Sequence, residues 1–164
     1  MEAIEIGRLS GDAEARACAA MMASSDPWLH FGRTFEQCLA RLTNPSGEVW
    51  VARAGGVPRG FIILILEGVF VGYIQIVCVE ASARGAGLGS HLVAFAEERI
   101  FREFPNVFLC VSAYNPRARA LYERLGYTLV GELNDYLTRG ESEFLMRKSV
   151  GPLTGFLPAA HHST

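Results

Sequence analysis

The chain has 164 residues, half of them hydrophobic and a fifth charged, which is the composition of one ordinary folded domain. Its formal net charge of −2 leaves no surplus of basic side chains, so nucleic acid is not an expected partner. The longest apolar run, residues 61–66, is far too short to span a bilayer, and residues 1–5 lack the features of a signal peptide, so we expect a cytoplasmic protein without membrane contact.

The first half of the chain predicts a short edge strand, two helices and three strands. The expected bounds are strand 3–8, helices 12–23 and 34–42, and strands 49–53, 60–66 and 70–79. Thr34 is a preferred N-cap residue, and the segment Ser24–Trp28 separates the two helices. Gly55 and Gly56 are typical hairpin residues, so we expect the three strands to form a meander.

A glycine-rich turn, Arg84–Ser90 (RGAGLGS), joins the strand at 73–79 to a helix predicted at 88–104. The first backbone N–H groups of a helix have no partner within the helix, and the helix dipole places partial positive charge there. Gly85, Gly87 and Gly89 lack the Cβ atoms that would keep a phosphate away from these groups. The turn therefore predicts a site for a phosphorylated ligand.

The second half of the chain predicts a parallel crossover followed by a helix and a strand pair. Residues 107–111 are continuously apolar, as in a strand buried on both faces. Because a strand, a helix and a strand follow one another, strands 73–79 and 107–112 are expected to be parallel. The last expected elements are a helix that begins at Asn115-Pro116 and ends at Gly126, and strands at 127–131 and 143–147.

Neither a metal site nor a disulfide is indicated. The cysteines at 18, 38, 78 and 110 are widely spaced with no C-x-x-C pair, so we expect reduced thiols. The histidines show no ligand spacing. Residues 149–164 are rich in Gly, Pro and small side chains, and we expect a flexible C-terminal arm after a single domain at 1–148.

Two motifs resemble those of the GNAT superfamily of N-acetyltransferases. Residues 79–89 are similar to its acetyl-CoA motif, which reads Arg or Gln, two residues, Gly, one residue, then Gly or Ala. Residues 115–127 resemble its element N-x-x-A-x-x-x-Y-x-x-x-G-[FY], and the chain's ending is weakly similar to members that acetylate protein N-termini. The resemblance implies the mixed α/β GNAT fold, with a central mixed sheet of about seven strands and the parallel βαβ crossover at 73–112.

Acetyl-CoA is the cosubstrate that this resemblance implies. Its pyrophosphate would lie on the N–H groups of residues 85–90, and its pantetheine arm along the free edge of residues 76–79. Asn115 would hold that arm or cap its helix, and the small Ala118 would let the cofactor approach. The implied cofactor-binding residues are Val77, Cys78, Val79, Arg84, Gly85, Ala86, Gly87, Leu88, Gly89, Ser90, Asn115 and Ala118.

Tyr122 is the expected catalytic residue, since the CoA thiolate needs a proton or a hydrogen bond as it leaves. A phenol near pKa ~10 and a thiol near ~8.5 differ by ~1.5 units, so full proton transfer is uphill by ~2 kcal/mol. Tyr122 is therefore expected to act chiefly as a hydrogen-bond donor, and the backbone N–H near Val79 to stabilise the oxyanion. The base stays open: Tyr73 stands where some relatives carry Glu, and Glu67 and Glu80 could act only through water.

The acceptor is expected to be a primary amine, either a peptide N-terminus or a small cationic metabolite. The candidate acceptor-binding residues are Asp26, Trp28, Phe31, Tyr73, Gln75 and Tyr136. The alternative to an enzyme is a CoA-binding sensor or interaction module without turnover, and both a monomer and a homodimer stay open.

Overall fold

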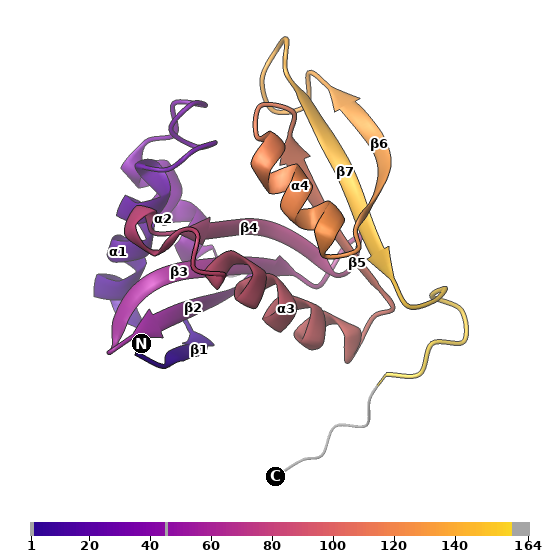
Figure 1. The fold of residues 1–164 in the computed structure, drawn as a ribbon, viewed down its shortest axis with the longest axis horizontal. Helices are drawn as coiled ribbons and strands as arrows, with labels where there is room; N and C mark the ends of the chain where they lie inside the picture. Colours follow the sequence, from indigo (N-terminus) through magenta and orange to yellow (C-terminus); the bar gives the residue numbers. More distant parts are fainter. Residues whose placement is uncertain (1, 45, 159–164) are drawn as a thin grey trace.

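The computed structural model describes residues 2–44 and 46–158 and shows a single seven-stranded mixed sheet with helices on both faces (Figure 1). The strand order is β1-β2-β3-β4-β5-β7-β6. The strands are β1 (Ile4–Arg8), β2 (Glu48–Ala54), β3 (Val57–Ile65), β4 (Tyr73–Val79), β5 (Asn106–Ser112), β6 (Thr128–Asn134) and β7 (Ser142–Ser149). The helices are α1 (Gly11–Ala23), α2 (Phe35–Thr43), η1 (Ala81–Ala83), α3 (Leu88–Phe101) and α4 (Pro116–Arg124). The predicted fold class and strand number are confirmed.

Strands β2, β3 and β4 form the predicted antiparallel meander, and β1 pairs antiparallel with β2 at the edge of the sheet. Gly55 and Gly56 turn the β2–β3 hairpin with φ angles of +56° and +78°, the left-handed conformations that a tight hairpin turn requires. The expected strand at 70–79 begins three residues late, at Tyr73. Gly72 is the reason, since its φ of +83° breaks the extended backbone ahead of Tyr73.

The crossover from β4 through α3 to β5 is parallel, as predicted. The helix ends at Phe101 rather than at residue 104, because the chain tightens into a turn in which Glu103 N–H donates to Ile100 O at 3.0 Å. Pro105 then stops any further helical hydrogen bonding. Parallel pairing is short and joins only Tyr73 with Phe108 and Ile74 with Leu109.

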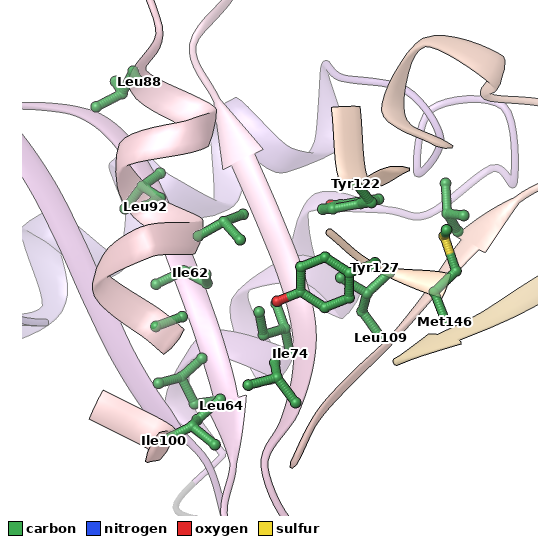
Figure 2. Packing of buried hydrophobic residues seen from close by; sticks show 14 of the residues in the cluster. Ile62, Leu64, Ile74, Leu88, Leu92, Ile100, Leu109, Tyr122, Tyr127 and Met146 are labelled. Atoms are coloured by element: carbon green, nitrogen blue, oxygen red, sulfur yellow. The ribbon is translucent and has the colours of Figure 1, made fainter. Parts of the chain in front are cut away.

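The sheet separates two hydrophobic clusters. The larger lies under α3 and α4, where Leu88, Leu92 and Ile100 pack on Ile62 and Leu64 (Figure 2). The smaller lies under α1 and α2 and includes Cys18, Cys38, Phe61, Ile63, Ile76 and Cys78. All four cysteines are free.

The end of the described chain leaves the sheet beside the start of β5. Val150 N–H donates to Pro105 O at 2.9 Å, and residues 151–158 form no helix or strand. The arm expected at 149–164 thus begins at the last residue of β7. Its expected flexibility stays a prediction. Residues 159–164 lie outside the described part. Within the described part, no helix has the length and apolar character needed to cross a membrane.

Candidate active site

A cavity of about 540 Å³ opens where β4 and β5 diverge beyond their two paired residues. Both strands line it, together with the α1–α2 connection, α2, α4, the β6–β7 connection and β7. Its lining includes Tyr122 from the α3/α4 side of the sheet and Cys38 from the α1/α2 side. The cavity therefore passes through the sheet and connects its two faces.

A β-bulge in β4 sets which side chains face which side of this opening. Ile63 pairs with Ile76 and Leu64 with Ile74, so Gln75 is an extra residue on β4. As a result Ile74 packs in the α3/α4 cluster, whereas Ile76 packs in the α1/α2 cluster. Gln75 itself lines the cavity.

The glycine turn brings the N-terminus of α3 to the end of β4. Gly87 is the N-cap of the helix, with φ of +85°, and Gly85 has φ of +83°. No atom lies within 4 Å of the position that a Cβ would take at either glycine. The first helical hydrogen bond runs from His91 N–H to Gly87 O at 3.0 Å, and the N–H groups of residues 85–90 meet no acceptor in the described chain. The helix dipole and these N–H groups form a site suited to an anion.

The Arg84 side chain turns away from this anion site. Its Nε donates to Val79 O at 3.0 Å and its Nη2 donates to Ser25 Oγ at 2.8 Å. Ser25 is buried at the end of α1 and donates to Met21 O at 2.6 Å. Arg84 therefore ties the glycine turn to the α1–α2 connection, and its side chain is not directed at the anion site.

Helix α4 begins with the predicted cap and carries Tyr122 into the opening. Asn115 Oδ1 accepts from Ala118 N–H at 3.1 Å, and Pro116 is the first helical residue. Tyr122 is buried beside Tyr127, with ring centroids 5.8 Å apart (Figure 2). Burial raises the pKa of Tyr122 to about 12. Its phenol is therefore a neutral hydrogen-bond donor at physiological pH.

The expected acceptor-binding residues come together in the cavity. All of them line it: Asp26, Trp28, Phe31, Tyr73, Gln75 and Tyr136. His30, from the same connection as Trp28, bridges to the β6–β7 connection, since its Nε2 lies 2.7 Å from Glu141 Oε1. Its ring also stacks on Tyr114, with centroids 4.0 Å apart. These contacts join the two loops that flank the acceptor side.

The expected cofactor-binding residues divide into two groups. Val77, Asn115 and Ala118 line the cavity with Tyr122. The residues from Arg84 to Ser90 do not line it, and Ala86, Gly87 and Leu88 border a separate hollow of about 450 Å³. The side chains of Cys78 and Leu88 are buried in the two hydrophobic clusters, so only their backbone is open to a ligand. The roles of both groups stay predictions.

Glu143 and Ser112 line the cavity and were not among the residues expected from the sequence. Glu143, on β7, is buried to 4% exposure and accepts a hydrogen bond from Ser112 Oγ on β5. The pKa of Glu143 is raised above its ordinary value, chiefly by burial and further by the charge of Glu141. The hydrogen bond from Ser112 opposes this shift. The available signal was a charged residue inside an otherwise apolar final strand. By contrast, Glu67 and Glu80 do not line the cavity, and Glu80 instead pairs with Arg59 at 2.7 Å.

The sequence of the chain is similar to a family of known proteins and to individual members with known names. A family model described as the acetyltransferase (GNAT) family matches residues 16–127. The chain is 37% identical over 90 residues to blasticidin-S acetyltransferase from Streptomyces morookaense, a match that covers 51% of this chain and 66% of that relative, just under two thirds of its length.

Solved structures share the fold at low sequence identity. An aminoglycoside 6'-N-acetyltransferase complexed with coenzyme A has a TM-score of 0.71 at 18% identity, covering 90% of this chain and 98% of that one. The ribosomal-protein-S18-alanine N-acetyltransferase from Escherichia coli has a TM-score of 0.72 at 19% identity, covering 94% and 99%.

Proposed function

Because the chain belongs to the GNAT family of acetyltransferases, we propose that it transfers the acetyl group of acetyl-CoA to the primary amine of a small cationic molecule. One observation carries this proposal. The cavity between β4 and β5 opens to both faces of the sheet, with Tyr122 on the α4 side and aromatic and acidic side chains on the other. A donor and an acceptor can therefore meet in it from opposite faces.

The glycine turn fits the pyrophosphate of acetyl-CoA. Residues 85–90 offer N–H groups without a protein acceptor, and the positions beside Gly85 and Gly87 are open. The edge of β4 beyond Ile74, which has no partner on β5, is suited to the amides of the pantetheine arm. When bound, acetyl-CoA supplies an acetyl carbon that an amine can attack and a sulfur leaving group.

Tyr122 contributes a hydrogen bond to that sulfur rather than a full proton. Its pKa of about 12 exceeds that of a thiol near ~8.5 by ~3.5 units, so complete transfer would cost ~5 kcal/mol. A hydrogen bond to the developing thiolate avoids this cost and is strongest in the transition state. We assign donation to the carbonyl oxygen to the backbone N–H near Val79.

A small cationic acceptor fits the cavity better than a protein N-terminus. Four charged residues line it: Asp26, Arg33, Arg41 and Glu143. Glu143 is the buried one of these four, so its carboxylate attracts a positive charge most strongly. The His30–Glu141 contact joins the two loops that flank the acceptor side, which we take to favour a small acceptor over an extended peptide. Blasticidin-S acetyltransferase, whose name states a small-molecule acceptor, is the relative at 37% identity.

Thiol release from acetyl-CoA tests the proposal. The purified protein is incubated with acetyl-CoA and a panel of small amines, including blasticidin S, aminoglycosides and polyamines, beside peptides with free N-termini. We expect amine-dependent thiol release with at least one small cation and none with the peptides. Binding of acetyl-CoA by calorimetry without release for any amine would favour a CoA-binding module without turnover. Release with peptides alone would contradict the choice of acceptor.

A further inference from the structure

Glu143 is a buried carboxylate that the fold leaves without a cationic partner. It is 4% exposed, and no ion pair involves it in the described chain. Its one hydrogen bond comes from the Ser112 hydroxyl, which reaches Oε1. A buried carboxylate without a cationic partner destabilises a fold. Because Glu143 lies in the wall of a cavity, a positively charged ligand in that cavity could pair with it.

The strand pairing places Glu143 on the acceptor side of the opening. Glu143 pairs directly with Ser112 across β5 and β7, so their side chains share a face. Leu109 and Val111, three and one residues before Ser112, pack on the opposite face in the cluster that contains Tyr122. Glu143 and Tyr122 therefore line one cavity from opposite faces of the sheet.

Two neighbouring titratable residues, Tyr73 and Cys110, cannot replace Glu143 as a proton acceptor. Burial raises the pKa of Tyr73 far above its ordinary value and also raises that of Cys110, so both stay protonated. Asp26, the other carboxylate in the cavity wall, is exposed to water. The charged and titratable groups that line the cavity or lie next to Glu143 are Asp26, Arg33, Arg41, Tyr73, Cys110, Tyr122, Tyr136 and Glu141 with its partner His30.

We propose that Glu143 binds the ammonium group of the acceptor and takes the proton that this group must lose before it attacks the thioester. The inference rests on the proposed acetyl transfer. Glu143 carboxylate and R–NH3+ become the carboxylic acid and R–NH2. The amine lone pair then forms the C–N bond to the acetyl carbon and the C–S bond breaks, its electron pair leaving with sulfur. The nitrogen's second proton and the Glu143 proton pass to the thiolate and to solvent.

The pH profile of E143Q tests the role of Glu143. Gln keeps an oxygen that can accept from Ser112 but cannot take a proton. For wild type, kcat/KM for the amine rises with pH and levels off once Glu143 is ionised. For E143Q we expect a loss of about 100- to 10,000-fold at pH 7. The loss should shrink about tenfold per pH unit, because the fraction of unprotonated amine rises as the pH approaches the amine pKa of ~10.4. The affinity of E143Q for acetyl-CoA should be unchanged.

Two further variants separate this role from a structural one. S112A removes the hydrogen bond that lowers the pKa of Glu143, so the rise in kcat/KM should move to higher pH while the plateau persists. D26N, a carboxylate change in the same cavity, should alter KM for the amine and leave the profile in place.

The outcomes distinguish this inference from the proposed function. If wild type is active and E143Q keeps its plateau within twofold, Glu143 is not the base and acetyl transfer stands. If wild type acetylates no amine, both proposals fail. If E143Q does not fold, S112A decides, and an unmoved profile in S112A overturns the inference.

Discussion

Replacing Tyr122 with phenylalanine removes a single oxygen atom from the cavity and leaves the packing of the ring unchanged. Within the described residues, the Tyr122 hydroxyl makes no hydrogen bond to the protein, so Y122F should fold with a melting temperature close to wild type. The hydroxyl matters only when sulfur becomes negative. A hydrogen bond to a charged group contributes about 1.5–3 kcal/mol, which predicts a fall in kcat of about 10- to 160-fold.

The assay is thiol release at saturating acetyl-CoA and amine, with acetyl-CoA affinity measured separately by calorimetry. Y127F is the matched control, because the Tyr127 ring contacts Tyr122 but its hydroxyl lies beside Glu97 and Tyr127 does not line the cavity. We expect Y127F to keep kcat. A kcat for Y122F within twofold of wild type, or an equal loss in Y127F, would refute the role given to Tyr122.

Three further predictions concern the turn, the sheet and an ion pair. Gly87→Ala and Gly126→Ala both place a Cβ at positive φ, so each should lower the stability by about 1–2 kcal/mol. Only Gly87→Ala should also weaken the binding of acetyl-CoA, which calorimetry measures. Gly72→Ala adds a Cβ that would clash with the backbone carbonyl oxygen of Asn106 on β5, so it should lower the melting temperature by about 6–12 °C. An unchanged melting temperature would contradict the β4–β5 packing. The hydrogen bond from Arg53 lowers the pKa of Glu14, so this pair stabilises the fold at neutral pH and the gain is lost as pH falls below about 4.5. E14Q should melt lower than wild type at pH 7, and the difference should shrink as the pH falls below about 4.5.

Local signals in the sequence were sufficient for most of the fold. Gly55-Gly56 turns the hairpin, Thr34 and Asn115 cap their helices, and the crossover is parallel, because each depends on neighbouring residues or on a handedness rule. The bulge at Gln75 had no such signal. An extra residue in one strand is defined only by its pairing with another strand, and pairing is not local.

The candidate site was predictable where a motif carried it. The glycine turn, Tyr122 and the acceptor-side aromatics follow from segments that are continuous in the sequence. Glu143 depends on β7 lying between β5 and β6, an order that differs from the order in the chain. Glu143 is buried because β7 lies between β5 and β6, whereas in the sequence it looks like an ordinary surface carboxylate near the C-terminus.

The brief pairing between β4 and β5 also has a consequence for how the molecule opens. Strands β1–β4 and strands β5–β7 each pair over most of their length, whereas two residue pairs join the two sets. We expect amide hydrogen exchange to separate them into two units of different protection, with the locally connected N-terminal meander forming earlier in folding. A ligand seated in the divergence touches both units, so it should merge their exchange behaviour into one cooperative transition.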